Sequence, residues 1–269
     1  MTLRPAGAAT SGQLTSAAHA VRARLSAEGI SAHASASGSV VTVSAPSTAL
    51  AAVVAAALPG VLTFREIYTD PGGHAYTSPA ATASSEVPSQ PVTVTDLDAP
   101  SSEPDQTTPS SATLAQFATL ECSKNGGRPG AIDEDPHHYV VACDRTGQMK
   151  YLLTPADFVA DQLASADAAV GAIPTGQPTY LWEVDVTFRS TAVPRVETVT
   201  SRLLHNNKQQ LAITLDGVVL SAPSTNGVLG ANITISGGTP PFSKGEAREL
   251  AGIVNAGPLS IALTADGAR

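Results

Sequence analysis

Aromatic and basic side chains are scarce in this sequence. Phe, Trp and Tyr make up 4% of the 269 residues, so the 42% hydrophobic content must build its cores largely from Ala, Val and Leu. Lys and Arg number 15 against 23 acidic residues, for a net charge of −8. Nucleic-acid binding needs concentrated basic side chains that neutralise phosphates. The sequence therefore argues against a nucleic-acid partner and gives no support to an anionic membrane surface.

Long hydrophobic runs are also lacking. The longest covers residues 49–58 and is followed by Pro59 and Gly60, whereas a helix that crosses a bilayer needs about 20 apolar residues. The N-terminal segment has neither the basic start nor the apolar stretch of a signal peptide. Composition alone leaves two expectations: a soluble cytoplasmic product, or a piece of a longer protein.

Familiar catalytic motifs are missing as well. The sequence has no GxSxG, HExxH, GxGxxG or GK[ST] pattern. One polar cluster, DEDPHH at residues 133–138, could hold a metal ion, but adjacent ligands on a loop with Pro are more typical of a solvated surface. We therefore predict no catalytic residue, no metal site, no cofactor and no small-molecule substrate. A hydrolase with an unfamiliar site remains an alternative.

The sequence holds only two cysteines, Cys122 and Cys143. Neither belongs to a CxxC pair, and no spacing of His and Cys around them fits a zinc site. They are either two unrelated buried thiols or a disulfide, and the disulfide is favoured because it would stabilise the fold by roughly 3 kcal/mol through loop closure. A disulfide would indicate a compartment outside the cytosol.

The chain divides into four blocks. In residues 1–76 the pattern predicts strand, helix, strand, helix and strand, the last at 61–68 with half-buried alternation. Residues 77–112 contain six Pro and five acidic residues but no aromatic or basic one, which predicts a disordered acidic linker. Five of the eight net negative charges therefore belong to the linker.

Residues 113–241 contain both cysteines and most of the strand signals. We predict a helix near 155–166, a strand at 180–189 and a helix at 191–206. Asp216 and Gly217 separate two apolar runs, at 211–215 and 218–222, which strongly predicts a hairpin with a type I′ turn. A further strand is expected at 233–235.

Residues 242–269 begin with a capping box, in which Ser243 and Glu246 satisfy each other's exposed amides. A helix follows, ended by Gly257, and a closing strand is expected at 259–263. One helix and one strand are too little to fold alone. We therefore expect this block to pair with the first block.

Several motifs together resemble the SecD family, translocase subunits that assist protein export. LAITLDGVVLSAPS at 211–224 is similar to the family signature "LAivLDGkViSaPv". Further similarities are looser in the first block and specific in the third and fourth. They lie at 21–29, 62–65, 140–144, 151–155, 182–188, 235–251 and 255–259.

The resemblance implies an α+β fold, the first large extracytoplasmic domain of an actinobacterial-type SecD. A ferredoxin-like base would be built from both chain ends, 1–76 and 242–269, with the linker 77–112 and an inserted α+β head at 113–241. Members of the family extend through six transmembrane helices and carry a D-x-x-GG motif, and neither is in this sequence. We therefore expect a piece of a membrane protein, located at the outer face of the bacterial plasma membrane.

The resemblance also implies the function. The head would hold emerging unfolded preprotein, while SecF and the Sec translocon would be partners through the parent protein, whose membrane part would couple to the proton gradient. The alternative is a free-standing secreted or lipoprotein SecD-like binding module without a transport role. The residues expected to contact substrate, at the rim of the hairpin and of a glycine loop, are Asp216, Gly217, Val219, Leu229, Gly237, Gly238 and Thr239.

Overall fold

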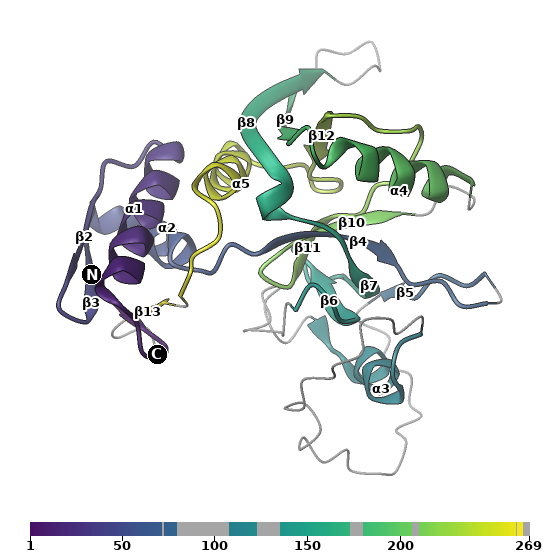
Figure 1. Cartoon of the computed structure of the whole chain (residues 1–269), viewed down its shortest axis with the longest axis horizontal. Helices are drawn as coiled ribbons and strands as arrows, with labels where there is room; N and C mark the ends of the chain where they lie inside the picture. The colour runs from purple at the N-terminus through teal and green to yellow at the C-terminus, as the bar shows by residue number, and fades with distance from the viewer. Residues whose placement is uncertain are drawn as a thin grey trace. The chain divides into compact units, whose positions relative to one another are not determined.

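The computed structural model describes residues 1–71, 73–79, 108–122, 135–172, 180–205, 210–261 and 263–265 (Figure 1). They form a mixed α+β fold of two compact units, which confirms the expected α+β class. The first unit comprises Met1–Leu62, Val159–Lys208 and Thr225–Arg269, and the second comprises Thr63–Phe158 and Gln209–Ser224. The first unit groups strands expected in the head with elements expected in the base. The predicted division into base, linker and head stays a prediction.

A four-stranded antiparallel sheet joins the two ends of the chain in the first unit. Its order is β13-β1-β3-β2, and Leu3 at its centre pairs with Ala265 on one side and Val41 on the other. The expected pairing of the last block with the first is therefore confirmed. The strands are β1 (Thr2–Pro5), β2 (His33–Ser37), β3 (Val40–Ser44) and β13 (Leu263–Ala265).

Two expectations for this sheet were wrong. The closing strand lies at Leu263–Ala265 rather than at 259–263, because the Leu259 N–H donates to the carbonyl of Pro59, at 2.7 Å, instead of joining the sheet. Strand β2 was not predicted at all. Its sequence, HASAS, has the alternation of a strand but no β-branched or aromatic side chain to signal it.

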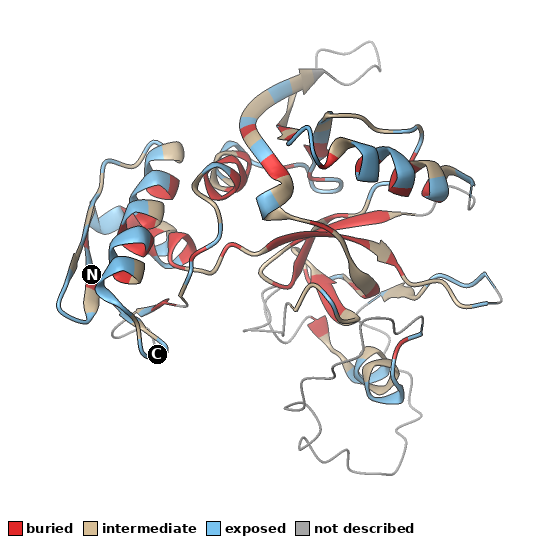
Figure 2. Cartoon of the chain, in the orientation of Figure 1, coloured by how far each residue is buried: buried red, intermediate tan, exposed pale blue. Residues whose placement is uncertain are grey.

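Helices α1 (Ser11–Ala27) and α5 (Lys244–Ala256) pack against each other. The predicted capping box of α5 is present, and α1 has an equivalent one between Thr10 and Gln13. The apolar face of α1 is buried in the core beside the sheet (Figure 2). A short 3₁₀ turn, η1 (Ser47–Ala49), leads into α2 (Leu50–Ala56), which covers the same core.

Arg24 lies fully buried beside this core. Its guanidinium donates to the carbonyls that end two helices: Leu58 O at 2.6 Å after α2, and Gly257 O at 2.8 Å after α5. Two further bonds reach Ala56 O and Pro59 O. A cation at helix C-termini satisfies carbonyls that have no partner within the helix, so Arg24 ties the two chain ends together.

The first unit also holds a three-stranded antiparallel sheet, of order β12-β9-β8. Residues 155–166, predicted as a helix, instead form the end of one strand, a 3₁₀ turn η4 (Ala160–Gln162) and the start of β8. Propensity favoured the helix in this Ala-rich segment, but pairing of β8 with the strongly β-forming β9 decides the outcome. The elements are β8 (Leu163–Ala172), β9 (Tyr180–Phe188), β12 (Asn232–Ser236) and helix α4 (Val193–His205).

The second unit is built on a six-stranded sheet of order β4-β10-β11-β6-β7-β5. An additional β4–β7 pairing closes β4, β10, β11, β6 and β7 into a ring. Strand β4 is therefore buried on both faces, with Phe64 and Arg65 inaccessible, rather than half-buried as expected. The elements are β4 (Leu62–Ile67), β5 (Thr77–Pro79), β6 (Val140–Asp144), β7 (Met149–Val159), β10 (Leu211–Leu215), β11 (Val218–Ser221) and helix α3 (Ser111–Thr119).

The predicted linker is described only at its two ends. Thr77–Pro79 pairs with β7 as β5, and Ser110 caps the start of α3 through the N–H of Thr113, so these ends are ordered. Residues 80–107 lie outside the described part of the chain, and the prediction for them stands as made.

Candidate functional site

The hairpin expected at the substrate rim is formed by β10 and β11. Asp216 and Gly217 have φ values of 47° and 76°, which a type I′ turn requires, so the predicted turn is confirmed. Val219, however, is only 1% exposed and packs with Ala212, Ala142 and Leu153 in the core of the second unit. Gly217 is buried as well. Of the three hairpin positions proposed to contact substrate, only Asp216 is even partly exposed.

The glycine loop after β12 has a different structure. At Gly237 an added Cβ would collide with the backbone nitrogen and ring of Phe242, so this glycine is required for close packing. Gly238, with φ 71°, and Thr239 are exposed. Phe242 itself is buried and forms an isolated bridge with Trp182 of β9.

A second segment of the first unit, residues 225–231, is exposed at Asn226 and Val228. The Leu229 N–H donates to the hydroxyl of Thr200 on α4, at 3.0 Å, which fixes the segment against the helix. Leu229 is half-buried, whereas its neighbour Val228 is 53% exposed. The predicted rim residues are thus divided: Leu229 and the glycine loop belong to the first unit, and the hairpin belongs to the second.

The sheet of β8, β9 and β12 has two faces of opposite character. Trp182, Val184 and Val186 of β9 lie on the apolar face, and α5 packs against the sheet. The other face carries the carboxylates of Asp167, Glu183 and Asp185, with Asp167 and Asp185 directly opposite each other. Burial, and secondarily the charge of Asp185, raises the pKa of the Glu183 carboxyl.

Sequence reasoning missed this acidic face. The sequence does indicate the part of this face that lies on β9, because Glu183 and Asp185 alternate with the apolar residues of the predicted strand. Asp167 could not be added, since its segment lies directly after the residues predicted as a helix. The acidic face exists only because β8 is a strand in register with β9.

The second unit contains the disulfide. Cys122 and Cys143 are bonded, with their Cα atoms 5.6 Å apart, so the chain after α3 is fastened to β6. Lys150 of β7 reinforces this attachment, because its ammonium donates to Ala118 O and Leu120 O at the end of α3. Burial lowers the pKa of Lys150. These contacts are structural, since each anchors α3 to the sheet.

Of the acidic and histidine-containing cluster at 133–138, residues 135–138 form a loop. Asp133 and Glu134 lie outside the described residues. The buried Arg65 donates to the carbonyls of Asp135 and His138, at 3.0 and 2.8 Å, and His138 Nδ1 is 3.6 Å from Asp135 Oδ2. Within the part of the chain that the structure describes, no three His, Cys, Asp or Glu side chains gather as metal ligands.

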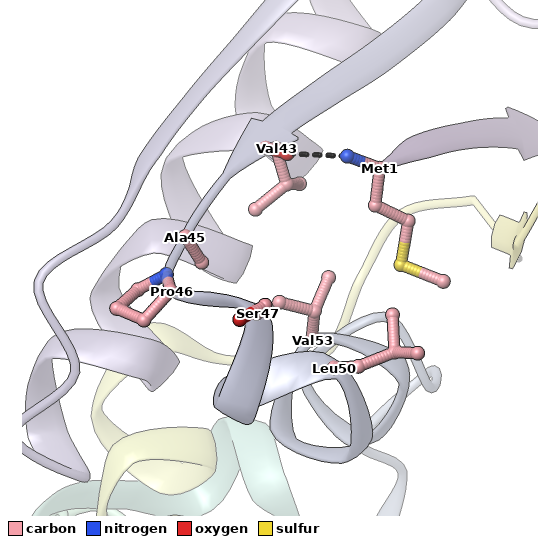
Figure 3. A pocket seen from close by; sticks show the side chains of 7 residues that line it. All are labelled: Met1, Val43, Ala45, Pro46, Ser47, Leu50 and Val53. Carbon is pink, nitrogen blue, oxygen red and sulfur yellow. Dashed lines mark hydrogen bonds between the residues drawn. The ribbon is translucent and has the colours of Figure 1, made fainter.

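A shallow hollow of about 230 Å³ lies beside the four-stranded sheet and is drawn in Figure 3. Its lining is mostly apolar, with the Ser47 hydroxyl and the Met1 amine among its polar groups, and Leu50 lines it with 56% of its surface exposed. The Met1 amine donates to Val43 O at 2.7 Å. The hollow can therefore accept apolar groups.

These regions offer surface on which a partner could bind. The first unit offers exposed apolar side chains, an acidic sheet face and strand edges. Strand edges and apolar patches are the features by which proteins take up extended polypeptide. Among the helices described, none is long and apolar enough to cross a membrane.

Comparison with known proteins assigns the fold. Residues 139–261 match the family model described as "SecDF, P1 head subdomain". The chain is 30% identical over 147 residues to the protein translocase subunit SecD of two Mycobacterium tuberculosis strains, CDC 1551 / Oshkosh and H37Rv. The matched region covers 54% of this chain and 24% of those relatives, so the chain spans about a quarter of their length.

Two solved structures are similar over nearly the whole chain. One, described as a membrane component SecDF that enhances protein export, aligns with a TM-score of 0.56 at 20% identity, covering 100% of this chain and 98% of that chain. The other, a crystal structure of SecDF in a super-membrane-facing form, aligns with a TM-score of 0.55 at 18% identity, covering 98% of this chain and 29% of that one.

Proposed function

We propose that this chain, whose residues 139–261 match the SecDF P1 head subdomain, is a SecD-type domain that handles substrate for a protein-export machine. In this proposal it holds unfolded preprotein by binding and catalyses no reaction. The observation that carries the proposal is the agreement of the family match with a structural similarity that spans the chain.

The proposed base is ferredoxin-like and is built from both ends of the chain. The order β13-β1-β3-β2, with β1 paired to both β13 and β3, supports this arrangement. So does Arg24, which donates to Leu58 O after α2 and to Gly257 O after α5, the latter 233 positions from Arg24 in the sequence. The head is proposed to be the inserted part that meets substrate.

Holding an unfolded chain requires exposed groups that fit many sequences. Val228, Val170 and Leu50 are each about half exposed. Apolar contact is non-directional, so such side chains can meet nonpolar segments of many sequences. Val228 lies on a segment fixed to α4 through Leu229. It is therefore a firmly positioned contact point, and it replaces the buried Val219 in the proposed rim.

We propose that the domain works at the outer face of the bacterial plasma membrane. The Cys122–Cys143 disulfide supports this location, because such bonds persist in oxidising compartments. SecF and the Sec translocon would be its partners through a parent protein whose membrane part couples to the proton gradient. The alternative is a secreted or lipoprotein binding module of the same fold without a transport role, and hydrophobic segments encoded on both sides of residues 1–269 would decide against it.

Photo-crosslinking tests the proposed substrate handling. A photoreactive amino acid is placed at the exposed Val228 or Thr239 and, as control, at the exposed Ser16 on α1. The purified chain is then mixed with a secretory precursor, either diluted from urea or folded. We expect crosslinks from positions 228 and 239 to the unfolded precursor alone. Crosslinks from position 16 only, or equal labelling of the folded precursor, would contradict the proposal.

A further inference from the structure

Strand β8 has an open edge. It is the outer strand of the β12-β9-β8 sheet, and its register with β9 runs without a shift from Ser165 to Ala172. An edge strand presents unpaired backbone N–H and C=O groups on every second residue, which makes it a template for another strand. The register of β8 with β9 determines which residues of β8 carry these unpaired backbone groups.

Asn255 of α5 identifies the outward-facing residues. The N–H of Ala166 donates to Asn255 Oδ1 at 3.0 Å, and Asn255 Nδ2 donates to Ala166 O at 2.7 Å. Both backbone groups of Ala166 therefore point away from β9. In an antiparallel ladder this orientation repeats every second residue, so the N–H and C=O groups of Ala168 and Val170 point outward as well.

These outward groups are available. Among the residues that the structure describes, no hydrogen bond engages them on the outer side. Val170 is 48% exposed, and Ala168 has too small a side chain to shield the edge. Figure 2 shows this stretch of β8 as exposed or intermediate. Asn255 fills the equivalent position at Ala166, so an added strand would have to begin beyond it.

The acidic face adds charge beside the same edge. The Glu183 carboxylate lies over the backbone of Gly171, in the space that a Cβ would occupy, and so reaches from β9 across β8. Asp167 stands exposed on the same face. Within the described residues, neither carboxylate has a basic partner. A Lys or Arg on a strand next to β8 would meet both.

We propose that the outer edge of β8 at Ala168 and Val170 binds an extended polypeptide segment as an added strand. Apolar side chains of the segment lie beside Val170, and basic side chains lie beside Glu183 and Asp167. This mode rests on the proposed function, because it specifies how preprotein is held. Backbone hydrogen bonds supply affinity for any sequence, and the two faces select segments in which apolar and basic residues alternate.

Proline substitution tests the edge. Pro at Ala168 removes an N–H that the ladder with β9 does not use. Pro at Ser236 is the matched control on the opposite edge of the sheet. Ser236 lies opposite Glu183, whose backbone N–H and C=O face β8, so the N–H of Ser236 also points out of the sheet and is not used by the ladder. The probe is a short fluorescein-labelled peptide in which Val alternates with Lys, and its binding to the whole chain is followed by anisotropy. We expect A168P to weaken binding about tenfold and S236P to leave it unchanged.

Two further measurements complete the test. In the wild-type chain, bound peptide should protect the amides of Ala168 and Val170 from hydrogen exchange, a readout that needs no variant to fold. A peptide of alternating Val and Glu should bind at least tenfold more weakly than the Lys peptide, and E183Q should reduce that preference while E197Q, on the exposed side of α4, should not.

The outcomes separate the two proposals. If unfolded precursor binds but A168P has no effect, or S236P abolishes binding instead, or the two amides stay unprotected, the β8 edge is wrong and substrate handling survives. Equal binding of the Glu peptide overturns the charge preference. If the wild-type chain binds neither peptide nor unfolded precursor, the proposed function itself fails.

Discussion

The side chain of Asn255 bonds twice to the backbone of Ala166, accepting from its N–H at 3.0 Å and donating to its carbonyl at 2.7 Å. The residues are 89 positions apart, and the contact attaches the last helix of the chain to β8. The carboxamide thus takes the place of a neighbouring strand at this one residue.

We predict that N255A lowers the free energy of unfolding of the first unit by about 1–2 kcal/mol, because two hydrogen bonds are lost and water replaces them in part. N255D keeps an acceptor for the Ala166 N–H but sets a second carboxylate oxygen against the Ala166 carbonyl, so it should lose at least as much. Urea unfolding followed by the fluorescence of Trp182, the single tryptophan, measures both. The control N226A changes an exposed amide and should stay within about 0.5 kcal/mol. A loss in N226A as large as in N255A would contradict the assignment.

Glu28 predicts a dependence of stability on pH. Burial, and secondarily the charge of Glu249 on α5, raises the pKa of its carboxyl from 4.5 to about 7. The folded state therefore favours the protonated form, a contribution fully present below pH 4.5 and lost as the pH rises through 7. E28Q should match the wild type at pH 4 and be more stable at pH 8 by about 1–2 kcal/mol, allowing for solvent screening.

Urea unfolding of E28Q and wild type at the two pH values checks this sign. The control E197Q removes an exposed carboxylate of α4 and should behave like the wild type at both. A stability advantage of E28Q at pH 4 that vanishes at pH 8 would refute the prediction.

The close packing around Gly237 predicts that alanine is far more destabilising there than at Gly230. G237A places a Cβ against the backbone of Phe242 and should destabilise the first unit by about 2 kcal/mol or more, since backbone cannot move aside cheaply. G230A meets no atom within 4 Å and should be neutral, or slightly stabilising through the unfolded state. Thermal unfolding compares the variants, and equal melting temperatures would show that the Gly237 packing is wrong.

The disulfide predicts a response to reductant. Cys122 and Cys143 close a loop with a sequence separation of 21, so their bond should stabilise the second unit by about 3 kcal/mol. Reductant should lower the melting temperature of the wild type to that of the C122S/C143S variant and should not affect the variant. Mass spectrometry should record a gain of about 2 Da on reduction. A wild type indifferent to reductant, with no mass change, would remove the support for an oxidising location.

The sequence predicted those parts of the fold whose signals are local. The Asp216–Gly217 turn, the Ser243–Glu246 capping box and helix α4 follow from short-range backbone chemistry, and each is confirmed. Segments settled by distant partners were missed. Residues 155–166 are strand and turn rather than helix because β8 pairs with β9, and β4 is buried on both faces because its sheet closes on itself.

The candidate site likewise has features that local sequence predicts and features that depend on distant partners. A glycine loop and a hairpin are visible in sequence, but whether Val219 points into the core or into solvent depends on which strands cover it. The β8 edge requires knowing that Asn255 faces Ala166 across 89 residues. Neither relation leaves a local pattern, so neither could be read before the strands were placed.

The proposed role of this domain is to hold unfolded polypeptide. The most direct test is the affinity of the purified chain for one secretory precursor in two states, unfolded and folded, followed by anisotropy of a label on the precursor. We expect the unfolded form to bind at least tenfold more tightly than the folded form. Equal affinities, or no binding of the unfolded form, would contradict it.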